Sequence, residues 1–279
     1  MEINGLILDD LRKDGARAWL LALSRWAQGA ALRKANGAFA ACAAWRDRLR
    51  QDYNLPQLEV LQNGVFFDEF AGAEAGSAAI RDRLGLDGSH QVLGYIGNLG
   101  RYYDFFPVLD CMREVLAEHP QFRVVLVGAG PSEDKLRVRV KDLKLEPWVK
   151  FHGPIPHKEV PHWIQAFDIG WLPVSAPRVK ETRGVLHAMK LAEYCAAGKP
   201  VLRVDYPGSD SWELLSDFSW GARPDGSDTL QMLLEALNCS ARWPTLGQTA
   251  QEFARSRLSW NATMEKLERL LSHWIKSKP

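Results

Sequence analysis

The sequence contains few cysteines, and none of them lies close to another. Four occur in 279 residues, with no Cys-x-x-Cys pair: Cys42, Cys111, Cys195 and Cys239. Structural zinc sites and redox dithiols need cysteines at short spacing, and small secreted domains carry them densely. The sequence therefore predicts reduced cysteines that serve packing in a cytoplasmic protein, with no metal site and no disulfide framework.

Long apolar runs and an excess of charge of one sign are also missing. The most apolar stretch, residues 16–44, is interrupted by Arg25, Arg33 and Lys34, whereas a spanning helix needs about 20 mostly apolar residues. The formal net charge is +1, so no global field attracts nucleic acid. We expect no spanning helix and no nucleic-acid partner, and at most peripheral contact with the inner face of a membrane.

The glycine fingerprint of dinucleotide-binding folds is absent as well. The nearest stretch is GNLG at residues 97–100. It has the wrong spacing for Gly-x-Gly-x-x-Gly, and no acidic residue closes the next expected strand. A dinucleotide-dependent oxidoreductase therefore ranks low among the candidate functions.

The sequence does contain a regular alternation of short apolar runs and longer helical patterns. Strand-length apolar runs lie at 91–97, 122–128, 148–153, 168–174 and 200–204, with a weak candidate at 37–42 and a stronger one at 58–64. Helical spacing lies between them, and the chain after residue 209 is expected to be mostly helical. Apolar strands alternating with helices are typical of a parallel sheet covered on both faces. The predicted fold class is α/β, with a Rossmann-like, doubly wound parallel sheet.

Such sheets bind ligands at the carboxyl ends of their strands, and the loops there carry suitable residues. Gly97 allows close backbone approach and Arg101 could bind phosphate, although a tight turn with a solvated arginine explains them equally well. The glycines of residues 128–136 form a stiff turn that could shape a pocket floor. The polar loop 175–186 holds three cations that together could neutralise a diphosphate: Arg178, Lys180 and Arg183.

The helix predicted over 188–197 begins at the same edge of the sheet. Its free N–H groups and the positive end of its dipole form a natural phosphate site. Lys190 lies in the first turn, where a cation is unfavourable unless a negative group is nearby. Glu193 follows one turn later, and a carboxylate can accept hydrogen bonds from two ribose hydroxyls. The alternative is a surface ion pair between Lys190 and Glu193, which is the usual meaning of this spacing.

Four segments stand in a characteristic order and spacing. They are LQNGVFFDEF (61–70), VLVGAGPSEDKL (125–136), the run 149–174 that ends in AFDIGWLPV, and KLAEYCAAGKPVL (190–202). Together they resemble the retaining glycosyltransferases of the GT-B fold, in particular family 4, from about residue 34 to residue 274. The resemblance implies two Rossmann-like domains around a cleft, with the nucleotide sugar held by the C-terminal domain.

The resemblance also implies roles for individual residues. Glu193 would hold the ribose, and Lys190, as the catalytic group, would neutralise the departing diphosphate together with Arg101 or the 175–186 loop. The other residues implied at the nucleotide-sugar site are Gly97, Asn98, Gly128, Pro154, Arg183, His187, Ala188 and Met189. Such enzymes need no metal and no cofactor. The donor is a UDP or GDP sugar, and transfer retains the anomeric configuration.

Two features depart from the family pattern. The first glutamate of the Glu-x7-Glu motif falls at Val185, which cannot bond a sugar hydroxyl. The front of the chain is also short. Residues 1–70 are expected to be a remnant of the N-terminal, acceptor-side α/β domain, residues 71–258 the nucleotide-sugar domain, and residues 259–279 a helix packing back towards the N-terminal part. Either the reading frame is truncated, or a second chain completes the cleft.

The leading hypothesis is a hexosyltransferase-type enzyme of polysaccharide biosynthesis, acting on a carbohydrate or glycolipid acceptor. The alternative is a nucleotide-sugar-binding module that has no turnover of its own or depends on a partner. The short front of the chain and Val185 favour this alternative. A nucleotide-sugar epimerase of the same fold ranks third.

Overall fold

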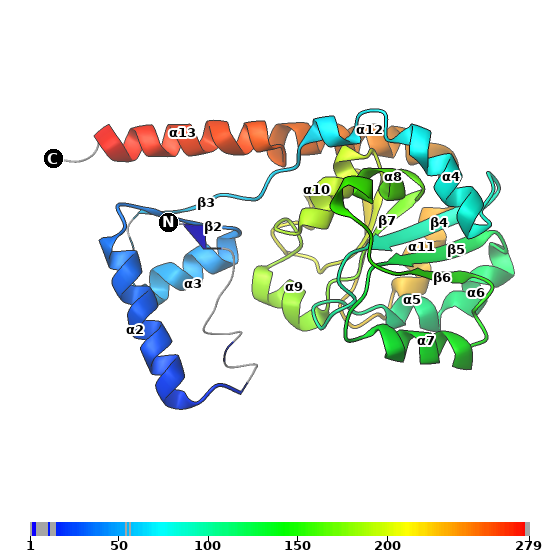
Figure 1. Ribbon diagram of the computed structural model, residues 1–279, viewed down its shortest axis with the longest axis horizontal. Helices are drawn as coiled ribbons and strands as arrows, with labels where there is room; N and C mark the ends of the chain where they lie inside the picture. The colour runs from blue at the N-terminus through cyan, green and yellow to red at the C-terminus, as the bar shows by residue number, and fades with distance from the viewer. Residues whose placement is uncertain (1, 4–10, 12–14, 54, 56, 277–279) are drawn as a thin grey trace. The chain divides into compact units, whose positions relative to one another are not determined.

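The computed structural model describes residues 2–3, 11, 15–53, 55 and 57–276, which fold as two compact units (Figure 1). Residues 65–259 form the central unit. Residues 1–64 and 260–279 together form the terminal unit. The chain therefore begins in the terminal unit, builds the whole central unit, and then returns to the terminal unit with its last helix.

The central unit is built on a six-stranded parallel sheet. Its strands are β4 (Gln91–Ile96), β5 (Phe122–Val127), β6 (Val149–His152), β7 (Ile169–Leu172), β8 (Val201–Val204) and β9 (Ser219–Ala222). They lie in the order β6-β5-β4-β7-β8-β9, each parallel to its neighbour. The chain winds from β4 to one edge, then returns to β7 and winds to the other. The carboxyl ends of β4 and β7 flank this reversal, where doubly wound sheets bind ligands.

Helices cover both faces of this sheet (Figure 1). One face carries α4 (Glu74–Leu84), α8 (Val160–Gln165), α9 (Ala176–Thr182), α10 (Met189–Ala196) and α12 (Trp243–Arg257). The other carries α5 (Phe106–Asp110), α6 (Met112–Glu118), α7 (Glu133–Asp142) and α11 (Thr229–Asn238). Short 3-10 turns are η1 (Phe67–Phe70), η2 (His157–Glu159) and η3 (Ser240–Arg242). Alternate strand residues, such as Val125 and Val124, enter opposite buried clusters, because successive strand side chains point to opposite faces.

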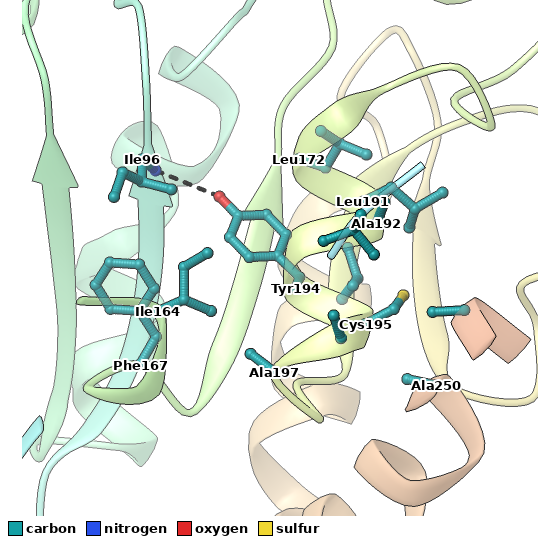
Figure 2. Packing of buried hydrophobic residues seen from close by; sticks show 14 of the residues in the cluster. Ile96, Ile164, Phe167, Leu172, Leu191, Ala192, Tyr194, Cys195, Ala197 and Ala250 are labelled. Carbon is teal, nitrogen blue, oxygen red and sulfur yellow. Dashed lines mark hydrogen bonds between the residues drawn. The ribbon is translucent and has the colours of Figure 1, made fainter. Parts of the chain in front are cut away.

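Helix α10 is fixed to the sheet by Tyr194. Its fully buried ring fills the space over Gly170 of β7, where an added Cβ would lie 2.4 Å from Tyr194 Cγ. Its hydroxyl accepts a hydrogen bond from the Ile96 N–H at 3.3 Å (Figure 2). The same hydroxyl donates a hydrogen bond to the Trp171 carbonyl oxygen at 3.2 Å. Since Ile96 ends β4 and Trp171 belongs to β7, one hydroxyl ties the helix to both strands of the reversal. The rotation of α10 that results also orients the preceding residue, Glu193.

The terminal unit has a smaller parallel sheet, in the order β1-β2-β3. Its elements are β1 (Glu2–Ile3), α2 (Ala18–Lys34), β2 (Ala38–Ala40), α3 (Ala43–Tyr53), β3 (Leu58–Val60) and α13 (Trp260–Lys276). Trp274 of α13 stacks on Phe39 of β2 with ring centroids 5.0 Å apart. An added Cβ on Gly37 would lie 2.2 Å from the Trp274 ring, so this glycine is needed for the packing. Among the described helices, none combines the length and hydropathy required to cross a bilayer.

The expected fold class is confirmed, and the structure differs from the sequence expectations in three local details. The helical pattern expected between the runs 91–97 and 122–128 forms two helices, α5 and α6, which meet at Cys111. The loop expected over 175–186 contains α9, with Pro177 in its first turn, a position where proline's fixed φ favours a helix. The chain after residue 209 is mostly helical, as expected, but it also includes the edge strand β9. Its four residues, Ser-Trp-Gly-Ala, lack the apolar run that identifies buried strands.

Candidate functional site

A pocket of about 350 Å³ opens at the carboxyl ends of β4, β5 and β6. It is lined by Ile96, Gly97, Asn98, Val127, Gly128, Ala129, Pro154, Ile155, His157 and Val160. Most of this lining is apolar side chain or backbone, and Asn98 and His157 supply its polar side chains, a composition typical of small-molecule sites. A hollow of about 570 Å³ lies elsewhere, but residues of α13 alone line it, so it is an open surface.

Two glycines bring the ends of β4 and β5 into close contact at this pocket. Gly97 has φ 136° and Gly128 has φ 129°, values that L side chains rarely adopt. An added Cβ on Gly128 would lie 1.9 Å from the Gly97 carbonyl oxygen. An added Cβ on Gly97 would lie 2.4 Å from Cε of Lys190. Both glycines are therefore required by the geometry, one for backbone packing and the other to leave room for the lysine.

The Lys190 side chain lies over this glycine turn and among aromatic rings. Its Nζ donates a hydrogen bond to the Tyr103 hydroxyl at 3.2 Å. The same atom lies 4.9 Å from the ring centroid of Tyr103 and 5.5 Å from that of Tyr95, within the range of cation–π attraction. Within the described residues no ion pair or hydrogen bond joins Lys190 to Glu193. The surface ion pair that the spacing suggested is therefore not formed.

Glu193 carries a half-buried carboxylate that no hydrogen bond satisfies within the described chain. Burial raises the pKa of Glu193, while the nearby positive charges of Lys190 and His157 oppose the rise and Glu69 adds to it. The carboxylate therefore lies close to one lining residue of the pocket and to the lysine. His157 had no sequence signal, because it follows β6 in a 3-10 turn and not in a recognisable motif.

The N-terminus of α10 begins at Ala188, whose side chain offers no cap. Met189, the next residue, is exposed. The first N–H groups of a helix have no partner within the helix, so this end can accept an anion. Val185 lies three residues upstream and is fully buried in the core, so the position of the missing glutamate presents no side chain to solvent.

Three of the remaining predicted cations contact neighbouring side chains. Arg101 donates a hydrogen bond to the Tyr102 hydroxyl at 3.2 Å, and Arg178 pairs with Glu181 at 3.0 Å. Arg183 pairs with Asp210 at 3.3 Å. Lys180 is exposed on α9. Across the described residues, no three His, Cys, Asp or Glu side chains gather as metal ligands would.

His187 precedes α10 and is held neutral. Burial, with the nearby charge of Arg178, lowers the pKa of His187 from 6.5 to about 4. As the pH falls below 6.5, the unfolded chain therefore takes up a proton before the folded chain does. The stability that depends on the neutral ring is present above pH 6.5 and is lost as the pH falls towards 4, by about 3 kcal/mol.

We expect His187→Gln to remove this part of the acid dependence. Urea unfolding between pH 7.5 and pH 4.5 measures it as the change in unfolding free energy with pH. The control is His273→Gln, which removes an exposed histidine of α13 and should retain the wild-type slope. An unchanged slope in His187→Gln would show that this ring does not titrate below its ordinary range.

Part of the chain matches a known protein family. Residues 77–212 match the family model described as Glycosyl transferases group 1. The D-inositol 3-phosphate glycosyltransferase of Corynebacterium jeikeium (strain K411) is 28% identical over 229 residues, which cover 76% of this chain and 51% of that protein. The chain spans about half the length of the curated relatives of this kind that it matches.

Solved structures share the fold. The crystal structure of Anabaena Alr3699/HepE in complex with UDP and glucose matches with a TM-score of 0.71 at 20% identity, over 87% of this chain and 64% of that one. A glycosyltransferase from Rickettsia africae ESF-5 matches with a TM-score of 0.72 at 12% identity, over the same shares of the two chains. At these identities the likeness is one of fold, the GT-B glycosyltransferase fold.

Proposed function

We infer from the match of residues 77–212 that this chain carries a glycosyl transferases group 1 region, and we propose that it transfers a sugar from a nucleoside diphosphate sugar to a carbohydrate or glycolipid acceptor. The observation that carries the proposal is the gathering of Lys190, Glu193 and the glycine-lined pocket at the reversal of the sheet. The pocket residues and the two side chains of α10 come from segments far apart in the sequence. Their meeting at one sheet edge is what a donor site of this fold requires.

In this proposal Glu193 binds the ribose of the donor. Its carboxylate has no hydrogen-bond partner of its own in the described chain, although a half-buried charge is unfavourable without one. Two vicinal hydroxyls would satisfy both oxygens. The base would then occupy the apolar pocket beside Pro154 and Ile155.

The diphosphate would lie between Lys190 and the first turn of α10. Gly97 allows the backbone after β4 to approach the phosphates, and Lys190 supplies a full positive charge. Tyr103 and Tyr95 hold that charge over the turn. As the bond from the sugar to the phosphate breaks, negative charge grows on the leaving oxygen, and groups already in place stabilise it without reorganisation.

Lys190 is therefore the catalytic group of the proposal, and it acts by charge. Protein groups take the place of a metal ion, and no cofactor takes part. Retention at the anomeric carbon and a UDP or GDP donor complete the proposal, on the resemblance to family 4. The proposal assigns no contact with the donor to Lys180 or to the three arginines described above.

A second candidate function is donor binding without turnover by this chain alone. Val185 favours it, because a buried valine stands where the family places a glutamate beside the donor sugar. A site with ribose and diphosphate contacts but without that carboxylate can hold a donor. Catalysis would then need groups from another chain.

Calorimetric titration of the full chain with UDP, GDP and ADP sugars tests the proposal. We expect saturable binding of the sugars of one nucleotide. The sugars of the other two nucleotides should not bind and serve as negative controls. Incubation with the bound donor then separates the two candidates, because slow release of free sugar indicates turnover and an unchanged donor indicates binding only. Failure of the folded chain to bind any of the three would contradict both.

A further inference from the structure

A buried ion pair lies at the carboxyl end of β8. Arg203 is 2% exposed and Asp205 is 0% exposed, and their side chains are joined by a short hydrogen bond. Neither residue belongs to the pocket. A buried ion pair of this kind adds little to stability compared with apolar residues of the same volume, so its presence calls for a structural explanation.

Each side-chain nitrogen and oxygen atom of this pair has at least one hydrogen-bond partner. Arg203 donates from Nε to the Ser219 hydroxyl at 2.9 Å and from Nη2 to the Trp212 carbonyl oxygen at 3.0 Å. Asp205 Oδ1 accepts from the Tyr206 N–H at 2.9 Å. A fully satisfied buried network holds its members in one arrangement.

The network ends at Ser211, which connects it to residues 183–188. We call these residues the donor loop. Ser211 is 0% exposed, and its hydroxyl donates to Asp205 Oδ2 at 2.5 Å. The same hydroxyl accepts from the backbone N–H of Val185 at 2.9 Å. Its donor and acceptor capacities are thus divided between the ion pair and the donor loop. One serine connects them.

The donor loop needs such support because its backbone is unusual. Arg183 has φ 52° and Gly184 has φ 119°, so two consecutive residues lie in the left-handed half of the map. An added Cβ on Gly184 would lie 2.1 Å from Ser211 Oγ, which shows that the hydroxyl occupies the space beside this glycine. The Asp210 N–H also donates to the Arg183 carbonyl oxygen at 2.8 Å. Residues 210 and 211 therefore both form hydrogen bonds to backbone groups of residues 183–185.

We propose that Ser211 is a positioning residue for the donor site: held by Asp205, it fixes the backbone of residues 183–188 and so places the first turn of α10. The inference rests on the proposed function, since the first turn of α10 is where the diphosphate would bind. Ser211 touches no ligand. Its effect on binding runs through the Val185 N–H.

The variant that tests this is Ser211→Ala, with Ser219→Ala as the matched control. Both remove one serine hydroxyl from the same network, but Ser219 bonds Arg203 and the Leu215 carbonyl oxygen and not the donor loop. Two measurements are made on the full chain. Amide hydrogen exchange is followed in peptides spanning 183–190, with 122–128 in β5 as the reference, and UDP and GDP binding is followed by calorimetry.

We expect Ser211→Ala to exchange faster over 183–190 and not over 122–128, and to weaken nucleotide binding five- to tenfold. That loss follows if the loop keeps its binding conformation about 10–20% of the time, because the apparent Kd rises by the inverse of that fraction. Ser219→Ala should exchange over 183–190 as the wild type does and bind within twofold of it. Thermal melting of both variants shows whether a general loss of stability could explain the difference.

The two readouts separate the possible failures. Unchanged exchange over 183–190 in Ser211→Ala overturns the proposal whether or not nucleotide binds. Faster exchange with an unchanged Kd also overturns it, because the loop would then be held without consequence for the site. If the wild type binds neither nucleotide, the proposed function fails, and the positioning role fails with it.

Discussion

Glu193→Gln is expected to lose most of the affinity for the nucleotide and yet to melt at a higher temperature than the wild type. The amide keeps the size of the side chain but loses its charge. Hydrogen bonds to a charged group are worth about 1.5–3 kcal/mol, so the Kd for the nucleoside diphosphate should rise by about 10- to 150-fold. Calorimetry at pH 8 measures this loss.

The gain in stability follows from the sign of the pKa shift. Burial raises the pKa of Glu193 in the folded state, so the folded chain holds the proton more tightly than the unfolded chain does. The ionised carboxylate therefore destabilises the fold at every pH above the raised pKa, and this penalty disappears as the pH falls to the ordinary value of 4.5. Glu193→Gln should melt above the wild type at pH 8 and together with it near pH 4.

The control is Glu235→Gln, which changes an exposed glutamate on α11 and should alter neither property. A variant that binds as tightly as the wild type would remove Glu193 from the donor site. A variant that binds weakly and also melts lower at pH 8 would show that the carboxylate has a structural partner. In that case the charge of Glu193 would not be available to bind a ligand.

Gly128→Ala should be among the most damaging glycine-to-alanine substitutions in the central unit. Its added Cβ would lie 1.9 Å from a backbone oxygen, that of Gly97, and a φ of 129° itself adds strain of about 1–3 kcal/mol for any other residue. Backbone cannot move aside as a side chain can. We expect a loss of at least about 3 kcal/mol, or a fall in Tm of roughly 6–12 °C for a unit of this size.

Two neighbouring glycines serve as comparisons. Gly97→Ala meets the flexible end of Lys190 at 2.4 Å, so we expect a smaller loss of stability together with weaker nucleotide binding. Gly153→Ala has nothing within 4 Å of its added Cβ and should stay within about 0.5 kcal/mol of the wild type. If Gly128→Ala melts at the same temperature as Gly153→Ala, the close approach between the ends of β4 and β5 is not needed for stability.

The parts of the fold that could be predicted are those in which local sequence and burial agree. The strands from β4 to β8 are short apolar runs, and their alternation with helices implies a parallel sheet. The glycines that follow β4 and β5 were found because a turn at a strand end must carry them. The edge strand β9 has no such signal, since half of its residues are serine and glycine.

The candidate site was predictable as a set of positions but not as a set of contacts. Lys190 and Glu193 could be placed on one helix face from their spacing, which favoured an ion pair between them. Lys190 instead donates a hydrogen bond to Tyr103. A tertiary contact of this kind cannot be predicted from the spacing of residues along the chain. The same holds for Arg203 and Asp205, which appear in the sequence as the polar end of a strand and prove to be fully buried.

The division of the chain has a consequence for its synthesis. Phe39 and Trp274 stack in one unit, but the ribosome makes all of residues 65–259 between them. At about 5–20 residues per second, that interval lasts roughly 10–40 s. During this interval β2 and Gly37 lack the Trp274 ring that later packs against them, while the six-stranded sheet can already form. The residues of β2 are thus made well before their packing against Trp274 can be completed, and a chaperone that binds nascent apolar segments could bind them in that interval.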